Sequence, residues 1–490
     1  MIRTLFVVSA VLLLATPALA IGNDDNNGWN FGGQRRRDYV DRDVCRNQPS
    51  AAALEICEKY CSRYECQKKN NFFNGWRCNN LRGDYETETT WKVLPCDYDV
   101  EFLPKGTDAV PAASPASLWP EDITALNEGA EFTVAGNDGD DIRVSAAGPL
   151  SGDAIVFVHG YSQARQTWAN YFADKKLTRK YRLVAMDIRG HGDSQKYTEA
   201  SSLPTITNKI NSAEIYRYSR IGEDLIRILI DTSIINPSAK ITLVGSSRGA
   251  LWAIAPLQNL NQRRQGLPTN GEGVFPPIPE FDNNGVTVPP INTNFLTTTQ
   301  AQDLFDRIVG YVGFGATTGT DAGSFGRSFV GIVKEAIRDP LMQGRSAPFE
   351  GAPTIDYILG EENAIGQFIE IAVTRDADPH VIDEHVRFTQ KTNSQTRFNI
   401  AGFIQATLNP ANDLGKATAL PLVDALPNRP LFIQGDYDDI NLQWVVFRNL
   451  QEHSPNAIRH LSPFTGHFPW IESAESYKRS TSYFREVFGY

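Results

Sequence analysis

Several features that would narrow the function of this 490-residue sequence are scarce or missing. Cysteine does not occur after residue 96, and there is no Asn-x-Ser/Thr acceptor for N-glycosylation, so glycosylation adds no support for secretion. Positive charge is also scarce. The net charge is -10, and the only basic cluster is the short run Arg35–Arg37. Nucleic acid is therefore excluded as an expected partner.

Long hydrophobic runs are also missing beyond the N-terminus. Residues 1–20 have a basic start, an apolar core from Leu5 to Ala15 and a small-x-small ending. This pattern predicts a secretory signal peptide. A membrane anchor is the alternative, but the apolar core is too short to cross a bilayer of about 30 Å. We expect a secreted, extracellular protein without a transmembrane anchor that begins near Ile21.

The cysteines themselves are confined to one short region. An even, clustered set that follows a signal peptide predicts three disulfides in a module at residues 45–96. Zinc binding is the alternative, but the paired C-x2-C spacing of zinc sites is missing. Spacing leaves all fifteen pairings open, and the module could bind a surface or protein partner, inhibit the neighbouring domain or brace it. The six residues are Cys45, Cys57, Cys61, Cys66, Cys78 and Cys96.

Composition divides the rest of the chain into a leader, a linker and one large domain. Residues 21–44 are rich in Asn, Asp and Gly and predict a flexible leader, in which Arg35–Arg37 is either a processing site or a solvated charge run. Residues 97–125 contain spaced prolines and predict a linker. Residues 126–490 then form the main domain.

Hydrophobic patterning predicts the class of this domain. Residues 131–135 and 142–146 flank an Asn-Asp-Gly turn and predict a hairpin. Continuous apolar runs at 154–158 and 182–186 are typical of buried parallel strands, and an amphipathic stretch at 221–230 predicts a helix. Alternating strands and helices predict an α/β fold with a mainly parallel sheet and helices on both faces.

Residues 240–250 provide the main functional motif. A β-branched run leads into Gly245-Ser-Ser247-Arg-Gly249 and then into helix-compatible residues. This strand-turn-helix pattern is typical of a nucleophile elbow, which exposes a serine at its apex. Gly-x-Ser-x-Gly alone occurs by chance in many chains, so its context decides whether Ser247 is a nucleophile.

Four further segments accompany the Ser247 motif in a fixed order. The five segments are His159-Gly160, Asp187-x-Arg189-Gly190-His191-Gly192-x-Ser194, Gly245-x-Ser247-x-Gly249, and residues 430–438 and 465–470. Together they resemble the α/β-hydrolase superfamily, in its branch of serine esterases, lipases and haloperoxidase-like proteins. The resemblance covers about residues 126–490 and implies an α/β-hydrolase sheet with an inserted helical lid.

Two stretches depart from this pattern. Residues 266–295 are rich in Pro, Asn and Gly and predict an irregular surface insertion. A strand at 308–313 resumes the sheet, and residues 318–425 predict a mostly helical lid or cap. We expect substrate choice to reside in the lid, so family resemblance does not identify the substrate.

The resemblance and the chain order of the fold point to His467 as the base. His467 follows a predicted strand at 457–461, and the order Ser, acid, His is that of this fold. His460 is the alternative, although it lies within the strand. We expect turn, packing or surface roles for the remaining five histidines, His159, His191, His380, His385 and His453.

A carboxylate is needed to fix the histidine tautomer. Asp438 matches the family position three residues after Gly435, at the end of a strand over 431–434, with Asp436 and Asp439 as alternatives. Asp187, in contrast, belongs to a turn and is expected to be structural.

The oxyanion needs preorganised donors. These would be the backbone N–H of Arg248 and, by resemblance, that of Tyr161.

The predicted function is a secreted serine hydrolase that cleaves a small-molecule or lipid-like carboxylic ester through an acyl-enzyme. This chemistry requires no cofactor and no metal. A serine nucleophile disfavours the epoxide hydrolases and haloalkane dehalogenases of this fold, which attack with aspartate. The alternatives are an aminopeptidase or amidase of the same fold, and a non-catalytic extracellular binding protein on a hydrolase scaffold.

Overall fold

A computed structural model describes the main domain with gaps. The described residues are 101–102, 126, 129–137, 139–196, 218–266, 295–318, 372, 385–389, 391–392, 420–435, 438, 440–441, 443–462 and 465–489. The predicted signal peptide, leader and cysteine module, with all six cysteines, lie outside them, as do the interior of the 266–295 insertion and most of the 318–425 lid.

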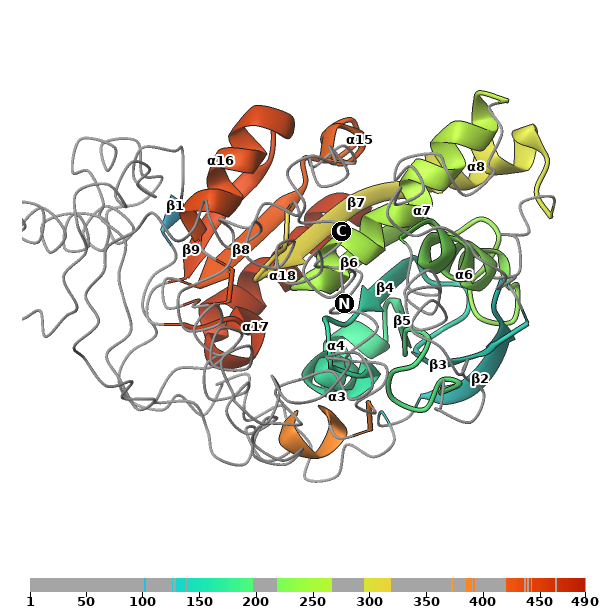
Figure 1. Ribbon diagram of the computed structural model, residues 1–490, viewed down its shortest axis with the longest axis horizontal. Helices are drawn as coiled ribbons and strands as arrows, with labels where there is room; N and C mark the ends of the chain where they lie inside the picture. Colours follow the sequence, from blue (N-terminus) through green and yellow to red (C-terminus); the bar gives the residue numbers. More distant parts are fainter. Residues whose placement is uncertain are drawn as a thin grey trace, which may run out of the picture.

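A single twisted sheet forms the centre of the described structure (Figure 1). Its order is β1-β9-β8-β7-β6-β4-β5-β3-β2, and all neighbours pair in parallel except β3 with β5 and β2 with β3. The strands are β1 (Glu101–Phe102), β2 (Ala130–Ala135), β3 (Asp141–Ala147), β4 (Ala154–Val158), β5 (Arg182–Met186), β6 (Ile241–Ser246), β7 (Ile308–Phe314), β8 (Leu431–Gly435) and β9 (Ile458–Ser462).

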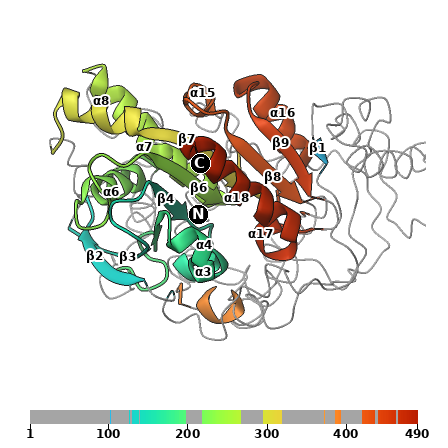
Figure 2. The same ribbon diagram turned by 180° about the vertical axis from the view of Figure 1, so that it is seen from behind.

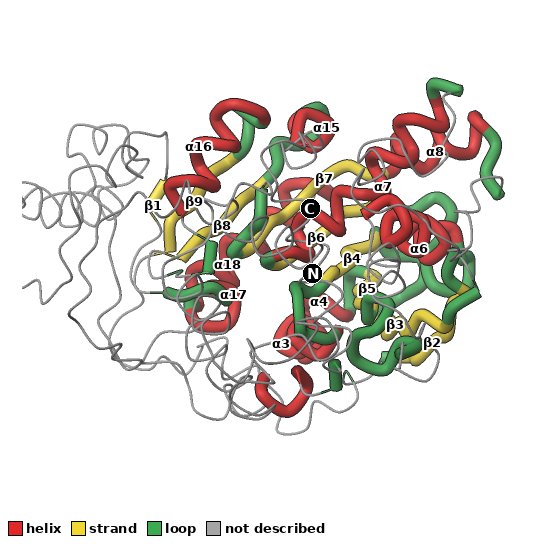
Figure 3. Tube along the Cα trace, viewed as in Figure 1, coloured by secondary structure: helices red, strands yellow, loops and turns green. Residues whose placement is uncertain are grey.

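Helices cover both faces of this sheet, as the front and back views show (Figures 1 and 2). One face carries α6 (Tyr218–Ile230), α7 (Arg248–Arg264), α8 (Thr298–Arg307), α15 (Leu420–Asp424) and α16 (Gln443–His453). The other carries the 3-10 helix η5 (Arg165–Trp168), α3 (Ala169–Ala173), α4 (Lys175–Thr178), α17 (Pro469–Glu472) and α18 (Ala474–Phe488). Figure 3 shows the resulting three layers by element type.

The parallel strands are buried on both sides because each face of the sheet has its own apolar core. In β4, Val156 and Val158 pack toward α6 and α7, whereas Ile155 and Phe157 pack toward α3 and α18. This two-residue alternation follows from strand geometry. It explains why the sequence of such a strand is a continuous apolar run rather than an alternating one.

Helix boundaries follow local capping chemistry. Thr297 and Gln300 form a reciprocal capping box at the start of α8, and the Ser473 side chain accepts from Ser476 N at the start of α18. α18 ends at Phe488, and Gly489 caps it with a φ of 76°, a left-handed conformation that suits glycine.

The α/β class predicted from the sequence is confirmed. The hairpin is β2 with β3, paired from Ala130↔Ala146 to Ala135↔Asp141, and the predicted helix over 221–230 is α6. Two residues of the predicted linker, Glu101–Phe102, form strand β1 at the edge of the sheet, in parallel with β9. The described parts of the predicted lid are helical at 385–389 and in α15.

Strand order also indicates where a ligand would bind. β4 lies between β5 and β6, so the chain leaves β4 in one direction and later returns on its other side. In open α/β sheets, ligands bind at the carboxyl ends of the strands around such a switch point. His159-Gly160 follows β4 and Ser247 follows β6 at this edge.

Candidate active site

Ser247 stands between the last residue of β6 and the first residue of α7. Its backbone has φ 54° and ψ -127°, a conformation that residues other than glycine adopt only with strain. Hydrogen bonds on both sides hold it there: Ser247 N donates to Phe314 O (2.9 Å), and Thr317 N donates to Ser247 O (3.0 Å). The loop after β7 therefore braces the predicted nucleophile elbow.

The elbow packs closely against the turn that follows β4. A Cβ on Gly249 would clash with the backbone carbonyls of Val158 and His159, so only glycine allows this approach. A Cβ on Gly160 would lie 2.8 Å from the Ser247 Cβ. Gly160 and Ser247 are thus direct neighbours, as the predicted oxyanion site requires.

Asp438 and His467 form a buried hydrogen-bonded pair. His467 Nδ1 lies 2.8 Å from Asp438 Oδ2, and neither side chain exposes more than 1% of its surface. The second carboxylate oxygen, Oδ1, accepts from Ile440 N and Asn441 N, both at 2.9 Å. Because a carboxylate only accepts hydrogen bonds, Nδ1 of His467 must carry the proton.

The other ring nitrogen of His467 is open. Nε2 is buried and has no hydrogen-bond partner among the described residues, Ser247 included. With Nδ1 protonated in the neutral ring, Nε2 has its lone pair available to take a proton. Catalytic hydrogen bonds are often long in ligand-free structures, so this gap does not argue against a proton transfer from serine.

One loop positions both His467 and Ser247. A Cβ on Gly315 would lie 3.0 Å from His467 Nδ1, while the flanking Phe314 O and Thr317 N bond to Ser247. Asn441 Nδ2 donates to Gly315 O (2.8 Å) and to Thr317 Oγ1 (3.1 Å). The structure therefore brings the three predicted triad residues to one loop, and the alternatives Asp436 and Asp439 lie outside the described residues.

The predicted oxyanion donors lie on either side of this site. Arg248 is the first residue of α7, and the first N–H groups of a helix lack partners within it. Tyr161 follows Gly160 in a turn closed by Gln163 N and Gly160 O (3.2 Å). The Arg248 side chain points elsewhere, since its guanidinium is buried and donates to the Tyr218 hydroxyl.

His159 is locked into a structural role. Nδ1 bonds to Gly160 O (2.8 Å), and Nε2 accepts from Ile188 N (3.0 Å), which together define the neutral ring. Burial lowers the pKa of His159 to about 4, since the charged ring would lose its hydration.

Asp187 is likewise saturated. Its two oxygens accept from Arg165 N and Asp193 N, both at 2.7 Å, and it pairs with the Arg165 guanidinium. No oxygen remains for chemistry, which agrees with the structural role predicted for this residue.

The other described histidines are either packed in the interior or at the surface. His191 packs against His159 with tilted rings (centroids 5.0 Å apart), and His460 is buried in β9 beside Arg479. His453 is partly exposed at the end of α16. His385 is buried in the lid region and lies 3.3 Å from Thr167 Oγ1.

Sequence reasoning missed the residues that fix the site rather than form it. Gly315, Thr317 and Asn441 lie against the predicted triad residues, and Gln163 bonds to the turn that contains Gly160. None of these positions belongs to a motif quoted above. The only available signal was the position of Gln163 three residues after Gly160, which does not specify a partner.

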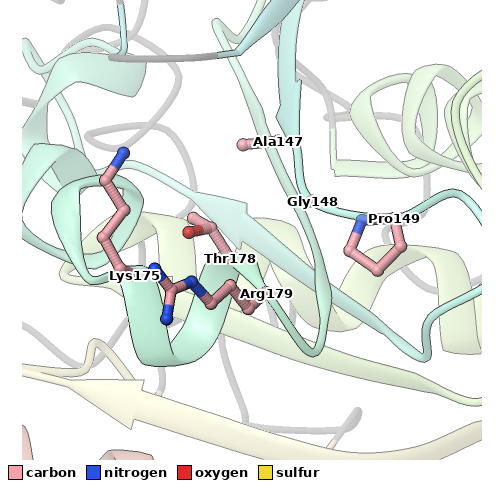
Figure 4. A pocket seen from close by; sticks show the side chains of 6 residues that line it. All are labelled: Ala147, Gly148, Pro149, Lys175, Thr178 and Arg179. Atoms are coloured by element: carbon pink, nitrogen blue, oxygen red, sulfur yellow. The ribbon is translucent and has the colours of Figure 1, made fainter.

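A pocket of about 500 Å³ lies elsewhere (Figure 4). Ala147 ends β3 opposite Leu183, near the start of β5, so this pocket is at the amino edge of the parallel strands, opposite Ser247. Lys175 and Arg179 are exposed at its rim. It takes no part in the candidate site and is lined by Ala147, Gly148, Pro149, Lys175, Thr178 and Arg179.

In the described part of the chain, no group of three or more His, Cys, Asp or Glu side chains could hold a metal ion. No described helix is both long enough and apolar enough to cross a membrane.

A family model and several solved structures match this chain. A sequence model described as "Alpha/beta hydrolase family" matches residues 155–477, whereas no curated protein matches the chain. Similar solved structures include a proposed aryl esterase from Burkholderia cenocepacia, with 19% identity over 74% of this chain and 100% of that one (TM-score 0.48). A bromoperoxidase from Bacillus anthracis has 14% identity over 73% and 100% of the two chains (TM-score 0.46).

Proposed function

The chain belongs to the alpha/beta hydrolase family, and from this premise we propose that it is a serine hydrolase that cleaves a carboxylic ester. One observation carries the proposal. His467 is bonded through Nδ1 to the buried Asp438 carboxylate, and its Nε2 has no partner among the described residues. The loop after β7 contacts His467 at Gly315 and bonds to both sides of Ser247. A base with a fixed tautomer and a serine at the apex of a strained elbow support nucleophilic acyl transfer.

The proposed reaction has two steps, acylation of Ser247 and hydrolysis of the acyl-enzyme. Ser247 Oγ attacks the ester carbonyl carbon while His467 Nε2 takes its proton. The tetrahedral intermediate collapses, the C–O bond to the alcohol breaks, and His467 returns the proton to the departing oxygen. Water then attacks the acyl-enzyme with His467 as base again, which releases the acid and restores Ser247.

Asp438 and the two backbone donors stabilise the charges that develop. The Asp438 carboxylate stabilises the imidazolium formed at His467 during attack. The N–H groups of Tyr161 and Arg248 receive the oxyanion, and loss of one such donor typically costs about 10²- to 10³-fold in rate.

Secretion is the second part of the proposal, and the pattern of residues 1–20 supports it. The full chain, expressed in a secreting host, should accumulate in the medium with an N-terminus near Ile21. Mass spectrometry that found Met1 on the exported protein would contradict signal-peptide removal.

Hydrolysis of p-nitrophenyl esters by wild type and by Ser247→Ala tests the enzyme proposal. Ser247→Ala should lower kcat by about 10⁶-fold, because it removes the attacking oxygen. Ser480→Ala is the matched control, since Ser480 is another buried serine, bonded to Tyr171 (2.8 Å) on the face of the sheet covered by α18.

The substrate panel separates the alternatives. Faster cleavage of aminoacyl p-nitroanilides than of esters would favour an aminopeptidase or amidase. Equal hydrolysis by wild type and Ser247→Ala would remove Ser247 from the mechanism, and a wild type inactive on both substrate types would favour a binding protein.

A further inference from the structure

Gln163 occupies a central position between the two halves of the candidate site. Its side chain is buried, and Oε1 accepts from Gly160 N (2.7 Å) and from Ser246 Oγ (3.1 Å). Gly160 belongs to the oxyanion turn, and Ser246 directly precedes the nucleophile. One amide oxygen therefore joins the turn after β4 to the elbow after β6.

Gln163 also fixes the peptide that carries the Tyr161 N–H. The carbonyl of that peptide, Gly160 O, accepts from Gln163 N (3.2 Å) and from His159 Nδ1 (2.8 Å). In a trans peptide the N–H points opposite to the C=O. Bonds that hold the Gly160 carbonyl on one side consequently hold the Tyr161 N–H on the other.

The amide nitrogen of Gln163 connects this turn to the lid. Nε2 donates to Thr167 Oγ1 (3.3 Å), and the same hydroxyl lies 3.3 Å from His385 Nε2. The Thr392 hydroxyl donates to Gln163 O (3.4 Å). We call residues 385–389, 391 and 392 the docking segment; its helix is the short orange one beneath α3 in Figure 1.

Packing and charge hold the docking segment in place. The His385 ring stacks on Phe468 (centroids 5.2 Å apart, 25° between planes), the residue that follows His467. It also packs against Phe388 (4.5 Å) within the segment itself. Lys391 pairs with Asp193 at 3.1 Å, so the segment is anchored to the turn that contains the saturated Asp187.

We propose that Gln163 is the positioning residue of the oxyanion turn and that the docking segment holds it there. The proposal rests on the proposed hydrolase function. Gln163 does not touch the reacting atoms; it keeps the Tyr161 N–H in the orientation that a developing oxyanion requires. Preorganised donors act mainly on the transition state, so loss of Gln163 should lower kcat rather than raise KM.

Gln163→Leu tests this directly because leucine fills a similar volume without the amide. We expect kcat on a p-nitrophenyl ester to fall roughly 10- to 100-fold, less than for loss of a whole oxyanion donor, since the donor is displaced rather than removed. KM should stay within about 3-fold. The affinity for a trifluoromethyl ketone, which forms a tetrahedral adduct with serine, should fall by the same factor as kcat/KM.

Two further variants separate positioning from folding. Gln258→Leu removes another buried glutamine, on α7, and should leave the affinity for the ketone unchanged whatever it does to the melting temperature. Thr167→Val breaks the link between Gln163 and His385 with little change in volume. It should lower kcat about 3- to 10-fold in the wild-type background and have no further effect together with Gln163→Leu.

The outcomes are distinct. Wild-type kcat and ketone affinity in a folded Gln163→Leu would overturn the inference and leave the proposed function standing. If Gln163→Leu does not fold, an unchanged kcat in Thr167→Val would overturn it instead. A wild type that neither hydrolyses esters nor binds the ketone would refute the proposed function and, with it, the inference.

Discussion

Two regions at the carboxyl edge of the sheet contain the same pair of residue types, a buried histidine and a buried aspartate. In the first region, His159 uses both ring nitrogens, and Asp187 uses both oxygens on backbone and Arg165 donors. In the second, Asp438 keeps one oxygen for His467, and the His467 Nε2 has no partner among the described residues.

The contrast separates residues that hold the fold together from residues that can transfer a proton. A histidine or aspartate whose hydrogen-bonding positions are all used holds the backbone in place. A pair that leaves one nitrogen open can move a proton. Residue type and burial are the same in the two regions. The two pairs differ in whether a ring nitrogen of the histidine is left without a hydrogen bond.

Among the substitutions that test this comparison, Asp438→Asn should have the largest effect on kcat. The oxygen of the new side-chain amide would still face Ile440 N and Asn441 N, so its NH₂ group would point at His467 Nδ1. Nδ1 would then have to accept, which moves the proton to Nε2 and removes the base. We expect kcat to fall about 10⁴-fold with little loss of stability, measured on p-nitrophenyl esters beside a thermal melt. A kcat close to wild type would give the acid role to Asp436 or Asp439.

Asp187→Asn should have the opposite effect to Asp438→Asn: it should lower the stability and leave the activity nearly unchanged. It breaks a buried ion pair with Arg165, whose remaining ion-pair partners, Glu131 and Asp193, are more exposed. We expect the free energy of unfolding to fall by about 3 kcal/mol, while kcat per folded molecule stays within a few-fold. Urea unfolding and active-site titration measure the two quantities. Unchanged stability with a lost kcat would place Asp187 in the chemistry instead.

Acid should destabilise the folded protein through His159 in the saturated region. The pKa of His159 is about 4 in the folded protein, below the ordinary value of 6.5, because of burial. The unfolded chain therefore binds the proton more readily, so stability is complete above pH 6.5 and falls as the pH drops toward 4. Linkage gives a loss of about 2 kcal/mol between pH 7 and pH 5.

The control for this pH dependence is His159→Asn, which does not titrate in that range. The difference in urea-unfolding free energy between pH 7 and pH 5 should be about 2 kcal/mol smaller in the variant than in wild type. Equal differences in the two proteins would mean that His159 is not the group responsible.

The sequence was sufficient for the α/β class and for several of its strands, although β1 lies in the predicted linker. Apolar runs located β4 and β5, and the Asn-Asp-Gly turn located the β2–β3 hairpin, because these signals are local. The ordered motifs also selected Ser247, Asp438 and His467, which the structure brings to one loop after β7.

The supporting hydrogen bonds could not be predicted in the same way. Asn441 bonds to Gly315 across 126 positions of sequence, and His385 approaches Thr167 across 218. Such partners are determined by tertiary packing, for which a single sequence has no periodic signal. For the same reason, no pattern indicated that Gln163 would connect the oxyanion turn to the elbow and to the docking segment.

Phosphonylation by a fluorophosphonate is the most direct measurement of the central claim, that Ser247 is a nucleophile activated by the open His467. Ser247 Oγ would displace fluoride from phosphorus, and peptide mapping by mass spectrometry would locate the adduct. We predict one adduct, on Ser247, in the folded wild type and a rate reduced by several orders of magnitude in His467→Gln. An adduct on another residue, or an equal rate of labelling in His467→Gln, would contradict the account.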